Sequence, residues 1–130
     1  MSWQMWYESL EKPSWTPSVM TISVIWSFLY PIILISFGYI LYRTLKGDIK
    51  KSVFVVFAIN LVANLLFTPI LFGLRSLILA SLDILIVLGT IVLGMITIWP
   101  YSKTLSLVQV PYLIWVSIAT VLQFSILSMN

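Results

Sequence analysis

The sequence predicts an all-α, polytopic membrane protein: a helical bundle of four transmembrane helices that follows a short amphipathic, aromatic segment. Charged residues make up 8% of the 130 residues, against about 25% in a typical soluble domain. These charges fall almost entirely in short gaps, and the apolar stretches between the gaps reach the length of about 20 residues that a membrane-spanning helix needs. We therefore expect a single membrane domain over residues 1–130.

Four stretches of the chain have the length and composition of membrane spans. They cover residues 19–42, 52–74, 76–98 and 105–129. The first, second and fourth contain no charged side chain, and the third contains only Asp83. Because apolar runs of about 18 or more residues are characteristic of transmembrane helices, we predict that each stretch forms one.

Residues 1–17 have the pattern of a helix that lies on the membrane surface. Four apolar side chains fall at helical spacing on one face: Trp3, Trp6, Tyr7 and Leu10. Aromatic side chains favour the headgroup level of a bilayer. Pro13 and Pro17 then interrupt the chain before the first span. We expect an interfacial segment here.

The basic residues indicate the orientation in the membrane. Loop 43–51 contains four basic residues and one acidic residue, and loop 99–104 adds a fifth basic residue. The opposite side has two basic residues, Lys12 and Arg75. Cytoplasmic loops carry an excess of Lys and Arg. We expect a multi-pass protein of a bacterial-type cytoplasmic membrane, with both loops in the cytoplasm and both termini outside.

The composition limits the chemistry that the chain can perform. It contains no Cys and no His, so disulfides, thiolate chemistry and the commonest metal ligand are excluded. The net charge of +3 is too small and too localised for a nucleic-acid partner. We expect no catalytic residue, no metal site and no cofactor, and we do not favour an enzyme.

Polar side chains inside the predicted spans are the candidates for function. Asp83 costs about 3 kcal/mol to insert, so it is either a hydrogen-bond partner for another span or part of a ligand cavity. Asn60, Asn64 and Thr68 repeat every four residues and share one helix face. They either join helices by hydrogen bonds or form the polar wall of a pocket.

The last span carries a large aromatic side chain well inside its predicted limits. Trp115 and Ala119 lie four residues apart on one face, with Ser117, Thr120 and Gln123 nearby. Trp115 is therefore either a core residue or a flat surface on which a ligand can stack.

Several segments, in order along the chain, resemble one known family. They are WYESLEKPSWTP (6–17), VIWSFLY (24–30), NLLFTPILFGLR (64–75), ASLDILIVLG (80–89) and PYLIWVSIATVLQF (111–124). This combination resembles the TspO/MBR family, the tryptophan-rich sensory proteins related to the mitochondrial translocator protein. Several separate motifs in the same order make the resemblance specific.

The chain also departs from the family pattern. Members usually have five helices, the first of which precedes the Trp-Tyr motif, whereas five residues precede that motif here. The resemblance therefore predicts a member that lacks the usual first helix, or one whose start lies upstream of residue 1. Ser18, Phe67 and Gln123 replace a family Pro, Trp and Asn. No basic residue follows Phe124, so the final sterol-recognition pattern is broken.

The resemblance implies a helical bundle in the lipid bilayer, often a homodimer, that binds flat hydrophobic ligands such as porphyrins as a sensor or carrier. The pocket residues that it implies are Trp15, Asn64, Asp83, Trp115 and Ala119, with Tyr7 and Trp26 as further members. Mostly apolar pockets with a few polar groups are typical of small-molecule sites. Without His or Cys, a porphyrin would be held by stacking and burial rather than by axial ligands.

Three alternatives remain open from the sequence. A proton-driven four-span exporter would need a titratable membrane carboxylate, and Asp83 is the one available. A porphyrin-degrading enzyme would have to rely on light or oxygen, with Trp as the redox partner. A purely structural membrane subunit would use Asn64 and Asp83 to pair helices and would contain no cavity.

Overall fold

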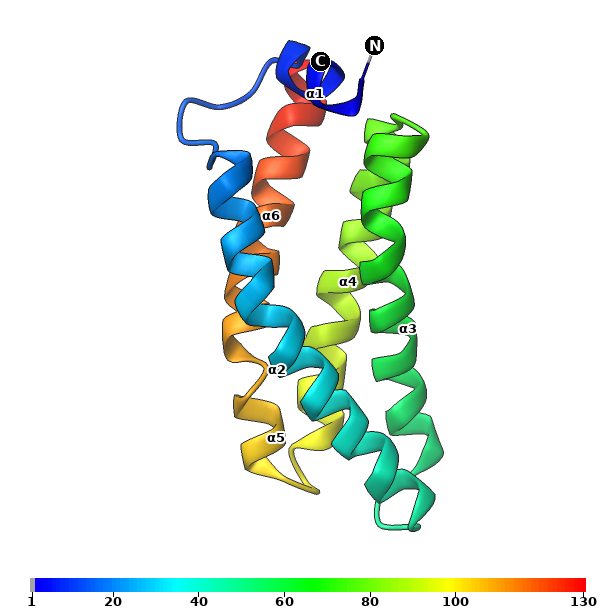
Figure 1. Cartoon of the computed structure of the whole chain (residues 1–130). Helices are drawn as coiled ribbons and strands as arrows, with labels where there is room; N and C mark the ends of the chain where they lie inside the picture. The colour runs from blue at the N-terminus through cyan, green and yellow to red at the C-terminus, as the bar shows by residue number, and fades with distance from the viewer. Residues whose placement is uncertain (1) are drawn as a thin grey trace.

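The structure is a computed structural model that describes residues 2–130 as an upright bundle of helices (Figure 1). Within these residues, four helical stretches are long and apolar enough to cross a membrane. They are α2 (Val19–Leu45), α3 with η1 (Lys51–Thr68 and Pro69–Gly73), α4 (Leu77–Ile98), and α5 with α6 (Lys103–Leu107 and Val110–Met129). The predicted fold class, a four-span helical membrane bundle, is confirmed.

The first span is longer than the apolar stretch that predicted it. It begins at Val19 because the Ser18 hydroxyl accepts a hydrogen bond from the Thr21 N–H at 3.1 Å. It continues to Leu45, three residues past the predicted limit of 42. Gly47 then adopts a φ of 86°, which is accessible to glycine at little cost and ends the helix.

The second span changes its helical geometry near its end. Pro69 has no backbone N–H, so it cannot continue the α-helical hydrogen bonding of α3. The chain instead forms the π-helical turn η1, in which the Leu74 N–H donates to the Pro69 carbonyl at 3.0 Å. The sequence predicted one uniform helix over 52–74, and the turn at its end was not foreseen.

The last span is interrupted, whereas the sequence predicted one continuous helix over 105–129. The short helix α5 starts earlier, at Lys103, and a turn at Val108–Gln109 separates it from α6. Pro111 supplies no N–H to the carbonyl of Leu107, which favours a break at this point. The buried Gln109 amide donates to the Ser36 hydroxyl of α2 at 2.9 Å and so fixes the break within the bundle.

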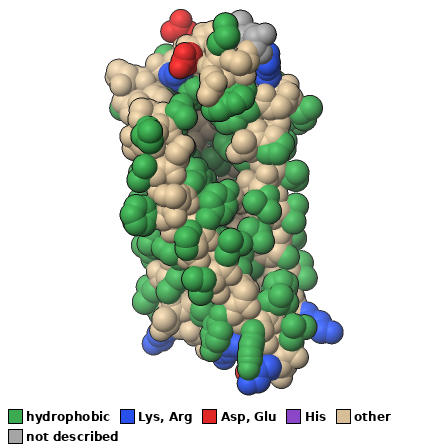
Figure 2. Space-filling view, in the orientation of Figure 1, with side chains coloured by type: hydrophobic (Ala, Val, Ile, Leu, Met, Phe, Trp, Pro, Cys, Tyr) green, Lys and Arg blue, Asp and Glu red, His purple; other side chains and the backbone are tan. Residues whose placement is uncertain are grey.

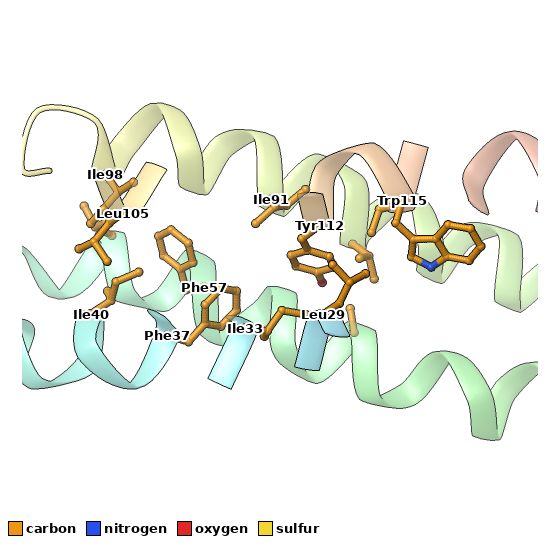
Figure 3. Close-up of a cluster of buried hydrophobic side chains, with 14 of the residues drawn as sticks. Leu29, Ile33, Phe37, Ile40, Phe57, Ile91, Ile98, Leu105, Tyr112 and Trp115 are labelled. Carbon is orange, nitrogen blue, oxygen red and sulfur yellow. The ribbon is translucent and has the colours of Figure 1, made fainter. Parts of the chain in front are cut away.

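The lower half of the bundle is densely packed. Phe57 of α3 and Phe37 of α2 meet edge to face, with ring centroids 5.0 Å apart (Figure 3). Gly94 allows α4 to approach them, because a Cβ at this position would lie 2.9 Å from the Phe57 Cζ. This half therefore holds the helices together.

Large apolar side chains cover the outside of the bundle (Figure 2). Met20, Phe28 and Ile35 are all more than two-thirds exposed, and they are typical of this surface. A soluble protein rarely leaves so large an apolar surface in contact with water. The exposed surface therefore fits contact with lipid, as expected of an integral membrane protein.

Both termini lie at one end of the bundle, and the loops at 43–51 and 99–104 lie at the other (Figure 1). Lysine and arginine side chains gather at the loop end (Figure 2). At the opposite end, α1 (Trp3–Ser9) lies across the top of the bundle. Its Tyr7 is buried, so this segment packs on the protein, and its position at the membrane surface stays a prediction.

Candidate ligand cavity

The upper half of the bundle contains a cavity of about 500 Å³ beneath α1. Figure 2 shows a hollow in this region, between the upper parts of α2 and α3. Side chains from α1, α2, α3, η1, α4 and α6 line it. Seven of the lining residues are aromatic: Trp3, Tyr7, Trp26, Tyr30, Phe67, Phe72 and Trp115. The cavity thus presents several flat apolar surfaces between the helices.

The structure brings five of the seven predicted site residues to this cavity. They are Tyr7, Trp26, Asn64, Trp115 and Ala119. They come from four elements that are distant in sequence, so their convergence is a property of the fold. Their contact with a ligand stays a prediction.

Trp15 and Asp83 are not among the side chains that line the cavity. Trp15 is 49% exposed and lies in the turn that the Thr16 N–H closes onto the Pro13 carbonyl at 3.1 Å. Asp83 is buried on α4, and the neighbouring Ile84 lines the cavity in its place. Successive residues of a helix point about 100° apart, which separates the Asp83 side chain from that of Ile84.

A network of hydrogen bonds fixes the amide of Asn64. The Tyr30 hydroxyl donates to Asn64 Oδ1 at 3.0 Å, and Asn64 Nδ2 donates to the Tyr112 hydroxyl at 2.7 Å. Tyr112 donates in turn to Asn60 Oδ1 at 2.9 Å. Asn60 Nδ2 completes the chain by donating to the Val87 carbonyl at 2.9 Å. These bonds connect α2, α3, α4 and α6 at the base of the cavity.

Both interpretations of the polar helix face that carries Asn60 and Asn64 therefore apply: it joins helices by hydrogen bonds, and it forms part of the cavity wall. Asn60 is fully buried and joins α3 to α4. Asn64 joins helices and also lines the cavity. Thr68, one turn further along, lines the cavity as well. The alternative of a structural subunit without a cavity does not fit this arrangement.

Two tyrosines of the network were missed by the sequence analysis. Tyr30 lies four residues after Trp26, and their rings are 5.1 Å apart. Tyr112 lies three residues before Trp115 and is fully buried. Spacings of three and four residues place side chains on one helix face, so the two tryptophans could have pointed to both tyrosines.

The end of the cavity near the termini is covered by α1. Trp3 and Tyr7 pack against Phe72 of η1, with ring centroids 4.8 and 5.6 Å away. Burial raises the pKa of the Tyr7 phenol above its ordinary value, so this group stays neutral at physiological pH. The loop that follows α1 is held in place by Asn130 at the end of α6. The Asn130 side chain makes two hydrogen bonds with the Glu11 backbone, at 2.9 and 3.1 Å.

The described side chains that line the cavity are all uncharged. The polar members are hydroxyl and amide groups such as Ser27, Tyr30 and Gln123. Several are already engaged: Gln123 Nε2, for example, donates to Ser81 Oγ at 3.2 Å and to the Leu77 carbonyl at 3.3 Å. Such a site suits a mostly apolar molecule whose buried part is neutral.

Comparison with known proteins gives a consistent result over the whole chain. The model of the TspO/MBR family matches residues 1–129. The uncharacterized membrane protein YtaB of Bacillus subtilis (strain 168) is 39% identical over 127 residues, which cover 98% of this chain and 81% of that protein. The tryptophan-rich protein TspO of Bacillus cereus is 37% identical over 125 residues, 96% of this chain and 80% of that protein. The human translocator protein is 29% identical over 124 residues, 93% of this chain and 72% of that protein. The resemblance found in the motifs is confirmed.

Proposed function

This chain belongs to the TspO/MBR family, and from that premise we propose that its cavity binds a flat, largely apolar molecule of the porphyrin or tetrapyrrole class. The protein would act as a sensor or carrier of that molecule within the membrane. The observation that carries the proposal is the aromatic cavity of about 500 Å³ in the upper half of the bundle. Small-molecule sites commonly enclose about 300–1,000 Å³ and are mostly apolar.

The geometry of the lining supports a flat ligand in particular. Trp26 and Trp115 come from α2 and α6 and offer large rigid faces. Flat aromatic molecules gain offset-stacked or edge contacts on such faces in addition to burial. Asn64, held from two sides by Tyr30 and Tyr112, offers a polar group in a fixed orientation. A rigid site of this kind loses little conformational entropy when it binds a rigid ligand.

The charge distribution supports an orientation in the membrane. The loop end has five basic residues and one acidic residue, counted over 43–51 and 99–104. We place this end in the cytoplasm, following the excess of Lys and Arg in cytoplasmic loops. The cavity, which lies toward the other end, would then be closer to the outer face of the membrane.

A fluorescence titration tests the proposed function. Protoporphyrin is added to the protein in lipid nanodiscs, and quenching of tryptophan emission gives the affinity. Trp115→Ala removes a cavity face and is expected to weaken binding by about tenfold or more. Trp15→Ala removes an indole outside the lining and is the matched control.

Two results would count against this function. The first is the absence of saturable quenching in the wild-type protein. The second is an equal affinity in Trp115→Ala and Trp15→Ala, with both variants keeping the helical circular-dichroism spectrum of the wild type.

A further inference from the structure

Two lysines at the loop end of the bundle are held over exposed aromatic rings. Lys46 Nζ lies 5.1 Å from the centre of the Tyr42 ring, and Lys103 Nζ lies 5.5 Å from the centre of the Trp99 ring. Both rings belong to the exposed outer surface, and tyrosine and tryptophan near span ends favour the headgroup level of a bilayer. A lysine that is attracted to such a ring keeps its charge beside the headgroups. These two cations are therefore placed to meet the phosphate groups of lipids.

The positive charge of the loop end is largely uncompensated within the protein. The loops at 43–51 and 99–104 contain one acidic residue, Asp48. Its carboxylate lies 4.0 Å from Arg43 Nε. The four lysines of these loops have no ion pair with an acidic side chain anywhere in residues 2–130. This end therefore attracts negative charge from its surroundings.

The end of the bundle that carries the termini differs in this respect. Lys12 Nζ donates to the backbone carbonyls of Tyr7 and Leu10, at 2.8 and 3.1 Å, so this ammonium group is engaged within its own segment. Glu8 and Glu11 add two negative charges nearby in the sequence. An anionic lipid should thus prefer the loop end.

A shallow groove of about 350 Å³ adjoins the Trp99 ring. Met95, Ile96, Trp99 and Ser106 line it, at the end of α4 and on α5. The Ser106 hydroxyl is buried and already donates to the Met95 carbonyl at 2.9 Å. The groove therefore offers a mainly apolar surface that suits a hydrocarbon chain, and the ammonium group of Lys103 lies over the aromatic ring at its side.

We propose that this groove binds a phospholipid with a net negative headgroup, whose acyl chain lies against Met95 and Ile96 and whose phosphate pairs with Lys103. Basic sites at the ends of membrane helices recognise anionic headgroups, and lysine binds phosphate as a point charge. A zwitterionic phospholipid has the same phosphate and chains, but its own cationic group compensates the phosphate charge, so it binds more weakly. The groove lies near the basic loops and is separate from the aromatic cavity, so this inference does not depend on the proposed function.

Mass spectrometry of intact protein–lipid complexes tests the proposal. The protein is placed in nanodiscs that contain equal amounts of phosphatidylglycerol and phosphatidylcholine with identical acyl chains. The lipid molecules that stay bound after gentle release from the nanodisc are then identified by mass. The wild-type protein should retain phosphatidylglycerol in preference to phosphatidylcholine. Lys103→Gln should lower this preference by about tenfold, as expected for the loss of one hydrogen bond between charged groups.

Two variants that remove the same charge elsewhere are the matched controls. Lys46→Gln acts at the same end, beside a ring that does not line the groove. Lys12→Gln acts at the opposite end. Both should keep the preference within about threefold of the wild-type value, because neither lysine lies beside the groove.

A second pair of variants tests the acyl-chain site without a change in charge. Ile96 and Ile78 are both 64% exposed and lie toward opposite ends of α4. Ile96→Trp places a bulky ring in the groove and should reduce the amount of retained phosphatidylglycerol. Ile78→Trp adds the same ring outside the groove and should leave that amount unchanged.

Three results would overturn the proposal. The first is a wild-type protein that retains both lipids equally, a result that needs no variant. The second is a Lys103→Gln variant that keeps the wild-type preference. The third is an equal loss in Lys46→Gln and Lys103→Gln, which would assign the preference to the charge of the whole end and not to the groove. None of these measurements requires a ligand in the cavity, so their outcome leaves the proposed function to its own test.

Discussion

Tyr112 connects the two amides that the sequence placed on one face of α3. The Tyr112 hydroxyl accepts a hydrogen bond from Asn64 and donates one to Asn60. The bonds fix which way the Asn64 amide points, and this orientation is set before any ligand arrives. Binding of the proposed ligand would then avoid the cost of ordering that side chain.

The sequence analysis identified the asparagines and missed their partner Tyr112, which only its spacing of three residues from Trp115 could have indicated. Asn60 and Asn64 stand out because amides are rare in an apolar span, whereas the largely apolar ring of Tyr112 does not distinguish it from the other aromatic side chains of the chain. In a membrane helix, the lipid-facing and the buried sides are both apolar, so hydrophobic periodicity does not reveal which face turns inward. Trp15 was assigned to the pocket by resemblance, and only the geometry of its turn places it outside the lining.

Tyr112→Phe is expected to destabilise the bundle by about 1–2 kcal/mol. One hydroxyl serves two buried amides, and a single interhelical hydrogen bond in a membrane contributes about 0.6 kcal/mol on average. The free energy of unfolding would be measured by denaturant titration in detergent micelles. Tyr39→Phe, at an exposed position on α2, is the control and should change stability by less than about 0.5 kcal/mol. Equal stabilities of the two variants would refute the network as a stabilising element.

Two of the four spans deviate from a uniform helix, and each deviation occurs at a proline. At Pro69 the chain forms a π-helical turn, and near Pro111 it breaks into α5 and α6. The sequence showed where these prolines lie within or near the spans. It could not show the result, because a proline in a membrane helix can be absorbed as a kink, a π-turn or a break, according to which neighbours satisfy the freed carbonyl groups. Gln109 and Ser36, from different spans, decide the outcome at the second site.

Gly94→Ala tests the contact between α3 and α4. The added methyl group would lie 2.9 Å from Phe57 Cζ, and the fully buried Phe57 has little room to move. We expect a loss of about 1–3 kcal/mol in the free energy of unfolding, as for other overpacked cores.

Gly89→Ala is the matched control on the same helix, since its Cβ would meet nothing within 4 Å. Alanine favours helices over glycine by about 1 kcal/mol in water, so this variant should be at least as stable as the wild type. A Gly94→Ala variant as stable as Gly89→Ala would mean that α3 and α4 are not in close contact at Phe57.

The bundle divides into a packed half and a hollow half. The aromatic contact of Phe37 with Phe57 and the bond of Gln109 with Ser36 fill the half near the basic loops. The other half encloses the cavity and is covered by α1. The number of spans and the shared side of the two termini could be predicted from charge and length alone. The hollow could not, because cavity and core are lined by the same residue types and differ only in how the helices diverge.

The absence of cysteine from the sequence allows a clean test of orientation. Ser14→Cys and Ser52→Cys each introduce one thiol at an exposed position, on opposite sides of the first span, without changing the charge. In intact bacterial cells, a membrane-impermeant maleimide should label Ser14→Cys and leave Ser52→Cys unlabelled until the membrane is opened. The reverse pattern would invert the proposed topology, and labelling of both in intact cells would argue against a single orientation.

The most direct measurement for the cavity as a ligand site is the protoporphyrin affinity of Ala119→Trp relative to that of Ile118→Trp in the same nanodiscs. Ala119 lines the cavity, whereas its neighbour Ile118 is exposed on the outer face of α6. A bulky ring at 119 should occupy the ligand's volume and weaken binding by at least about tenfold, while the same ring at 118 should leave affinity within about threefold of wild type. If both variants bind protoporphyrin as tightly as the wild type does, the ligand does not occupy this cavity.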